Sequence, residues 1–380
     1  MDDRSVFRLS LFGALLGVER RWLRAGTVLV CAVLVFLSAC TVSPLLARSE
    51  ATTPLVLSPA TLAGVSDARG HFREVYCALN ERYGRNLPDY RPCERALWRL
   101  GKEPPGSPAK PTRKYAPVVL KVYVVPGILA ECMSHLATTL SDALAYLRAQ
   151  GYDAELISVS GRGGSANNAR AIRQAIVETK LARNERILLV GHSKGIVDIL
   201  DALATFPELE SKVAAVVSLA GAVNGSPLAD GLVEPIKALL ANFPFQRCAP
   251  GAEGIEDLYR GNRMLWLALH PLPKTIHYYS IAAFTTREEI SGILQPWFDK
   301  LSRVDPRNDG QLLYYDQIIP GATLLGYARA DHWAIALPLQ RNPKLSGMPS
   351  YSGNAFPREI LLQAVIKFIE ADLAVSISDR

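Results

Sequence analysis

The sequence has no large excess of positive or negative charge. It contains 42 basic and 36 acidic residues, for a formal net charge of +6, and nowhere do five charges of one sign follow each other. Proteins that bind nucleic acid usually gather their basic residues into a run or a patch. We therefore expect no nucleic-acid partner. With 21% charged and 49% hydrophobic residues, the chain also lacks the composition of a disordered protein.

The sequence also lacks an internal repeat and a cluster of metal-ligating residues. The stretch GRGGS at residues 161–165 is not followed by the Lys-Ser or Lys-Thr pair of a phosphate-binding loop. We interpret it as the turn after a strand. These absences lead us to expect no metal ion and no cofactor.

Residues 1–40 have the pattern of an export signal, in which basic residues (RRWLRAG) precede the apolar run of residues 27–40. That run is shorter than the roughly 20 residues of a membrane-spanning helix. Its end, Leu37-Ser38-Ala39-Cys40, resembles the lipobox of bacterial lipoproteins. The resemblance implies a lipid on Cys40, and Thr41 in place of aspartate implies the bacterial outer membrane, facing the periplasm. The alternative is an uncleaved signal anchor.

Residues 41–116 are predicted to form a tether, a helical hairpin and a proline-rich linker. Apolar residues at helical spacing in DARGHFREVYCALNERYG predict one helix, and LPDYRPCERALWRLG, which ends at Gly101, predicts a short second one. Cys77 lies in the first and Cys93 in the second. Because exported proteins keep disulfides, we predict that a Cys77–Cys93 disulfide staples the hairpin.

Residues 117–380 alternate between buried strands and helices. This alternation predicts an α/β fold with a mostly parallel sheet and helices on both faces, closed by an amphipathic helix in PREILLQAVIKFIEADL. Residues 231–274 break the alternation and form an insertion. The predicted strands are VVLKVYVV, AELISV, RILLV, VAAVVSLAG, TIHYYSIAAF and ATLLGYARA.

Ser193 lies in GHSKG, residues 191–195, directly after one strand and directly before a helix. This is the G-x-S-x-G pattern of a nucleophile elbow, where a strained turn raises the serine above the sheet and small neighbours avoid clashes. The alternative is an ordinary glycine-rich turn between a strand and a helix.

A nucleophilic serine needs a histidine base and an acid that orients the ring. Of six histidines, only His332 follows the last predicted strand. Among the carboxylates Asp305, Asp309 and Asp316, we favour Asp309, because its Asn-Asp-Gly sequence makes a tight turn that can aim a side chain. Asp331 is too near His332 along the chain to face its ring easily.

The stretches VVPGI, VGHSKG, AGAVNGSPLAD, RNDG and ADHW resemble those of bacterial α/β-hydrolase lipases and esterases. The resemblance implies the α/β-hydrolase fold and a Ser193-Asp309-His332 triad. It also implies an oxyanion hole made by the backbone N–H groups of Ile128 and Lys194. In such enzymes the insertion at residues 231–274 has the usual position of a cap over the site, where it either provides an acyl-chain pocket or simply packs on the sheet. Lys194 stands where the family usually has an uncharged residue, and Gln311 where it often has a small apolar one.

These observations predict a membrane-anchored serine hydrolase that cleaves carboxylic esters, with lipid-like acyl groups, through an acyl-enzyme. Two alternatives are an acyltransferase or thioesterase with the same triad, and an inactive scaffold that binds an envelope partner. We further expect Cys132, near the oxyanion loop, to pair with Cys248 in the cap. Two unpaired buried cysteines are the alternative.

Overall fold

A computed structural model describes residues 64–106, 118–232, 237, 242, 248–348, 350 and 355–378. These residues belong to one compact unit, Pro54–Arg380. The export signal, Cys40 and most of the tether lie outside the described residues, so they stay predictions. Within the described ranges, no helix is both long and apolar enough to cross a membrane.

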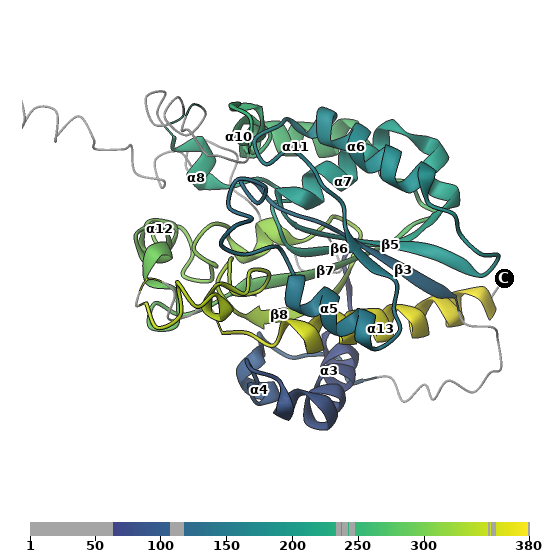
Figure 1. Ribbon diagram of the computed structural model, residues 1–380, viewed down its shortest axis with the longest axis horizontal. Helices are drawn as coiled ribbons and strands as arrows, with labels where there is room; N and C mark the ends of the chain where they lie inside the picture. Colours follow the sequence, from purple (N-terminus) through teal and green to yellow (C-terminus); the bar gives the residue numbers. More distant parts are fainter. Residues whose placement is uncertain are drawn as a thin grey trace, which may run out of the picture. The chain divides into compact units, whose positions relative to one another are not determined.

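An eight-stranded sheet runs through the molecule in the order β1-β8-β7-β6-β5-β3-β4, and β2 also pairs with β8 (Figure 1). Every pairing is parallel except that of β2 with β8. The predicted mostly parallel sheet is confirmed. The strands are β1 (Ser66–Asp67), β2 (Leu97–Trp98), β3 (Val119–Val125), β4 (Ala154–Leu156), β5 (Glu185–Ser193), β6 (Val213–Gly221), β7 (His277–Phe284) and β8 (Thr323–Arg329).

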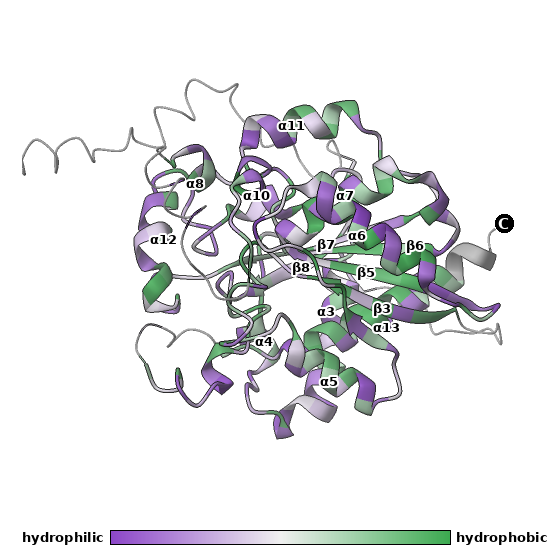
Figure 2. Ribbon diagram, turned by 45° about the horizontal axis from the view of Figure 1, so that its top comes forward, coloured by the Kyte–Doolittle hydropathy of each residue, from purple (hydrophilic) through white to green (hydrophobic). Residues whose placement is uncertain are grey.

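Helices cover both faces of this sheet because its central strands are apolar on both faces. In β3, Val122 and Val124 belong to one buried cluster, whereas Tyr123 and Val125 belong to another. Figure 2 shows mostly apolar strands surrounded by helices of mixed polarity. The first cluster includes side chains of α3 (Arg69–Tyr83), α5 (Ser141–Ala149) and α13 (Arg358–Ser378), and the second those of α6 (Ser165–Glu178) and α7 (Lys194–Thr205).

The closing helix α13 differs from the predicted amphipathic helix. Almost every side chain from Arg358 to Ile366 is buried. The reason is that α3 and α5 both pack against α13, which leaves little of its outer surface in contact with solvent. An amphipathic helix keeps one polar face toward solvent, and a helix covered by neighbours on most sides has no such continuous face.

The N-terminal hairpin is only partly as predicted. Helix α3 and the Cys77–Cys93 disulfide are present, with Cα atoms 5.3 Å apart. The predicted second helix is wrong in its extent, because α4 (Cys93–Ala96) ends after one turn and the chain continues as β2. The indole N–H of Trp98 donates a hydrogen bond to the carbonyl of Phe284 at 2.9 Å, and the two rings stack. Pairing with the sheet therefore replaces the expected helical turns.

Different parts of the cap insertion line a cavity and pack on the rest of the fold. Ile255 in α10 (Glu253–Glu256) and Leu258 just after it line a cavity beside Ser193. Trp266 in α11 (Arg260–Leu269) instead packs against the cluster under α6 and α7. The segment EPIKALLANF lies largely outside the described residues. Two further short helices, α8 (Pro227–Asp230) and α12 (Gln295–Leu301), flank the same end of the sheet, together with turns of 3-10 helix that include η4 (Tyr314–Gln317).

Candidate active site

Ser193 ends strand β5 and begins helix α7 with φ 54° and ψ −126°. A positive φ is strained for a residue with a side chain, at a cost of about 1–3 kcal/mol. The neighbouring glycines make the turn sterically possible. A Cβ on Gly191 would lie 2.5 Å from the Cα of Ile196, and one on Gly195 would lie 2.2 Å from the carbonyl oxygen of Val125. The local geometry is that of the predicted elbow.

The loop after β3 lies directly against Ser193, since a Cβ on Gly127 would come within 2.6 Å of the serine Cβ. The GRGGS turn holds this loop in place. The N–H of Leu129 donates to the carbonyl of Gly161 at 2.7 Å, and the N–H of Gly161 donates to Glu131 at 2.9 Å. GRGGS therefore serves as a turn between β4 and α6, as predicted.

The second predicted disulfide is also present. Cys132 and Cys248 are bonded, with Cα atoms 5.0 Å apart, which is within the normal range for a disulfide. The bond ties the loop that carries Ile128 to the start of the described cap.

His332 and Asp309 are joined by two hydrogen bonds. The ring Nδ1 of His332 lies 2.7 Å from Oδ2 of Asp309, and the His332 backbone N–H donates to the Asp309 carbonyl at 2.8 Å. Both side chains are buried. Because a carboxylate accepts hydrogen bonds, this contact places the ring proton on Nδ1 and leaves Nε2 as the basic nitrogen.

The Asn-Asp-Gly turn aims Asp309 at the ring. Gly310 has φ 88°, a conformation that glycine adopts without strain. The turn lets Oδ1 of Asp309 accept hydrogen bonds from the N–H groups of Gln311 and Leu312, at 2.8 and 2.7 Å. Gln311 thus helps through its backbone, and its replacement of a small residue does not disturb the carboxylate.

None of the other three candidate carboxylates contacts the ring of His332 among the residues described. Asp305 pairs with Arg307. Asp316 pairs with Arg260 at 3.1 Å, and burial raises its pKa to about 7. Asp331 accepts hydrogen bonds from Ser291 and from the backbone of the turn that follows it, and burial raises its pKa as well.

Two residues that support the site were not foreseen. Gln317 in η4 exchanges hydrogen bonds with the backbone of Ala283, at 2.6 and 2.9 Å, and donates to Asp309 at 3.3 Å. His192 places its Nε2 3.0 Å from the carbonyl of His332. Burial lowers the pKa of His192 to about 3, so the ring is neutral and donates that bond. His192 stood inside the elbow motif, whereas no local pattern distinguishes Gln317.

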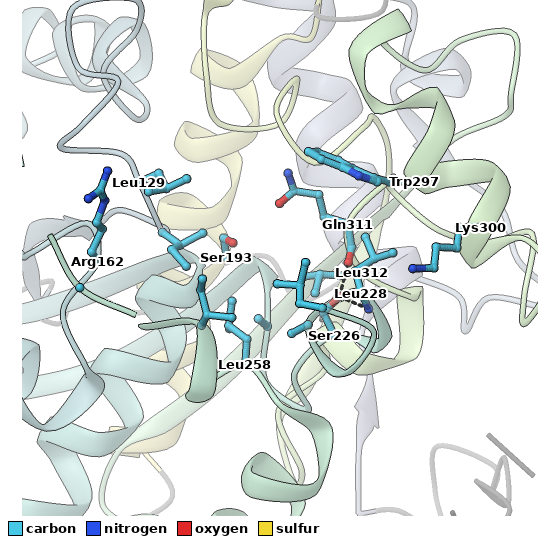
Figure 3. A pocket seen from close by; sticks show the side chains of 16 residues that line it. Leu129, Arg162, Ser193, Ser226, Leu228, Leu258, Trp297, Lys300, Gln311 and Leu312 are labelled. Carbon is cyan, nitrogen blue, oxygen red and sulfur yellow. Dashed lines mark hydrogen bonds between the residues drawn. The ribbon is translucent and has the colours of Figure 1, made fainter. Parts of the chain in front are cut away.

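Two cavities meet at Ser193, with volumes of about 220 and 110 Å³. The larger extends beneath α8, α10 and α12, and Figure 3 shows leucine side chains arranged around it. The smaller contains His332 and Trp333 as well as Ser193. Ile128, Leu129, Trp297 and Gln311 line both.

Among the described residues, the buried Nε2 of His332 has no hydrogen-bond partner. Ile128 and Lys194, whose N–H groups are the predicted oxyanion donors, directly follow Gly127 and Ser193. The side chain of Lys194 lines neither cavity and instead pairs with Asp198 in the interior. The site thus combines a buried hydroxyl and a buried imidazole at one cavity.

Comparison with known proteins identifies the family. No family profile and no curated protein matches the chain. Among solved structures, the lipase BlEst2 of Bacillus licheniformis in its mature form is 19% identical over 69% of this chain and 96% of its own, with a TM-score of 0.51, which shows the shared fold alone. The metagenomic carboxyl esterase MGS0156 is 40% identical over 87% of this chain and 100% of its own, with a TM-score of 0.78. The chain therefore belongs to the carboxyl esterase family of the α/β-hydrolase fold.

Proposed function

We propose that this esterase hydrolyses carboxylic esters with apolar acyl chains, using Ser193 as nucleophile, His332 as base and Asp309 as the orienting acid. The main support for this proposal is the buried Asp309–His332 hydrogen bond, combined with a cavity that both His332 and Ser193 line. With Nδ1 engaged by Asp309, Nε2 is left to take the serine proton.

In the first half-reaction, Ser193 Oγ attacks the ester carbonyl while Nε2 of His332 takes the hydroxyl proton. Asp309 stabilises the resulting imidazolium. The N–H groups of Ile128 and Lys194 bind the oxyanion, and each such donor contributes roughly 3 kcal/mol to lowering the barrier. His332 then protonates the leaving alcohol. In the second half, water attacks the acyl-enzyme with the same base, and the acid leaves.

The two cavities receive different parts of the ester. Because His332 must protonate the departing oxygen, the alcohol occupies the smaller cavity, which His332 lines. The acyl chain then occupies the larger cavity, where Leu228, Leu258 and Leu312 provide an apolar lining. An apolar lining stabilises each added methylene by about 0.8 kcal/mol, which favours acyl groups longer than acetyl.

The proposal also includes the anchor. Lipid attached to Cys40 would hold the enzyme on the bacterial envelope, at the periplasmic face of the outer membrane, where lipid-like esters are abundant. The lipobox sequence supports this part, since residues 1–63 lie outside the described structure.

A labelling experiment with a fluorophosphonate probe tests the nucleophile. We expect the chain to be labelled and Ser193→Ala to remain unlabelled, and both should show the same thermal unfolding. The esters to use are p-nitrophenyl acetate, butyrate, octanoate and palmitate. Labelling of Ser193→Ala, or hydrolysis of none of the four esters by the wild type, would contradict the proposal.

A further inference from the structure

Lys194 follows the proposed nucleophile, but its side chain leads away from the substrate. It is only 1% exposed. Its Nζ lies 2.5 Å from Oδ1 of Asp198, one turn further along α7, and 3.6 Å from Oδ2 of Asp257. Asp257 directly follows α10 in the cap. One ammonium group therefore joins the nucleophile helix to the cap.

Helix α6 completes this cluster, in which Lys194 and Asp198 are buried and the Asp257 side chain is 29% exposed. The amide of Asn168 donates to Asp198 at 2.8 Å, and the N–H and hydroxyl of Ser165 donate to Asp257 at 2.6 and 2.8 Å. Both carboxylates thus have partners besides Lys194. Burial raises the pKa of Asp198, and the Lys194 ammonium opposes that rise.

The cap lies directly on the Lys194 side chain. A Cβ on Gly254 in α10 would come within 3.1 Å of the Lys194 Cε, and the Gly254 N–H donates to the Arg162 carbonyl at 3.0 Å. Removing an ammonium group from water costs several kcal/mol, and nearby carboxylates offset that cost only while they stay in place. The position of α10 is therefore coupled to the charge of Lys194.

The segment around Asp257 also lines the larger cavity, to which the acyl chain is assigned above and which is called the acyl cavity from here on. Ile255 lies two residues before Asp257 and Leu258 one residue after it, and both line the larger cavity. We propose that Lys194 is a positioning residue: through Asp257 it holds α10 against the acyl cavity and determines how well long acyl chains bind. This inference rests on the assignment of the acyl chain to the larger cavity.

The test compares p-nitrophenyl octanoate with p-nitrophenyl acetate in Asp257→Asn. This variant keeps the Lys194–Asp198 pair and the size of the side chain but removes the carboxylate charge by which the cap faces Lys194. We expect kcat/KM for octanoate to fall about fivefold more than kcat/KM for acetate, mostly because KM rises. A fivefold change corresponds to a normal coupling energy between neighbouring charges. Glu256→Gln is the control, because this adjacent carboxylate pairs with Lys237 instead, and its octanoate-to-acetate ratio should equal that of the wild type.

A double-mutant cycle shows whether Lys194 acts through Asp257. Lys194→Met should shift the octanoate-to-acetate ratio of KM values in the same direction, and adding Asp257→Asn should shift it no further. Equal losses on both esters, or an unchanged ratio in Asp257→Asn, would overturn the inference. If the wild type hydrolyses neither ester, or Ser193→Ala retains activity, the proposed function fails instead. Thermal unfolding of each variant separates loss of fold from loss of positioning.

Discussion

Asp309 accepts hydrogen bonds from two backbone N–H groups as well as contacting His332. The turn thus fixes the carboxylate before substrate arrives, and the carboxylate fixes the tautomer of the ring. Asp305, four residues earlier, has a similar local setting but faces Arg307. The two residues therefore form a matched pair for testing the proposed acid.

Asp309→Asn should lower kcat by about four orders of magnitude, because an amide favours the wrong ring tautomer. Asp305→Asn should stay within about threefold of wild type, since Asp305 pairs with Arg307 and not with the proposed base. Steady-state kinetics with p-nitrophenyl butyrate measure both. Near-normal turnover in Asp309→Asn with a loss in Asp305→Asn would reverse the assignment of the acid.

Asp316 makes stability depend on pH. Burial raises its pKa from 3.8 to about 7, and Asp230 adds to the rise, whereas the paired Arg260 opposes it. Between pH 4 and pH 7 the folded protein keeps a proton that the unfolded chain has lost. The free energy of unfolding contributed by this group is therefore fully present below pH 4 and decreases as the pH rises toward 7.

Asp316→Asn should remove that dependence. We expect wild type and variant to have similar unfolding free energies at pH 4, and the variant to be more stable at pH 8 by a few kcal/mol. Urea denaturation at both values gives the difference, in which the contributions of all other titrating groups cancel. A constant difference across this range would show that Asp316 is ionised throughout.

At the scale of elements, the sequence predicted those turns and junctions whose conformation depends only on neighbouring residues. The β5-Ser193-α7 junction follows from an apolar run, two glycines and a helix-forming stretch, all within twenty residues. The Asn-Asp-Gly turn of Asp309 is equally local. The alternation of strands and helices predicted the fold class, and the turn together with the position of His332 after the last strand predicted the Asp309–His332 contact.

What the sequence could not predict depends on distant partners. Leu97 and Trp98 form a strand because Ala328 and Tyr327 of β8 are beside them, although nearby residues favour a helix. Gln317 supports Asp309 only because β7 brings the backbone of Ala283 within reach. Lys194 has a local partner in Asp198, but its second partner, Asp257 of the cap, lies far along the chain. Each of these distant contacts follows from tertiary packing rather than from periodicity.

The two disulfides should have different effects when removed. Cys132–Cys248 joins the oxyanion loop to the cap, so the Cys132→Ser/Cys248→Ser variant should lose most of its kcat/KM at temperatures where the sheet is still folded. Cys77–Cys93 joins elements of the N-terminal region, and its removal should lower stability by roughly 3 kcal/mol without changing kcat. Activity and circular dichroism followed together during heating separate the two effects. Parallel loss of both signals in the Cys132–Cys248 variant would refute a role in holding the loop.

At the scale of the whole molecule, Cys40 should decide where the enzyme resides. Multiple acyl chains give a firm anchor, whereas a single chain binds only marginally. Cys40→Ser should therefore incorporate no labelled palmitate and accumulate as an unprocessed precursor. Normal lipid labelling of that variant would exclude Cys40, and an unlabelled wild type of full precursor mass would favour the uncleaved signal anchor.

Strands β1 and β2 both pair with β8 on the side away from β7, at Thr323–Leu324 and at Tyr327–Ala328. They occupy the backbone groups of a strand that would otherwise be the open edge of a hydrophobic sheet, and such edges recruit other chains. The N-terminal segment thus also protects this edge of the sheet from pairing with other chains. We expect a chain that begins at residue 117 to form large soluble assemblies or precipitate, and a chain that begins at residue 54 to remain dispersed in light scattering. A well-dispersed, folded chain from residue 117 would show that β8 needs no such protection.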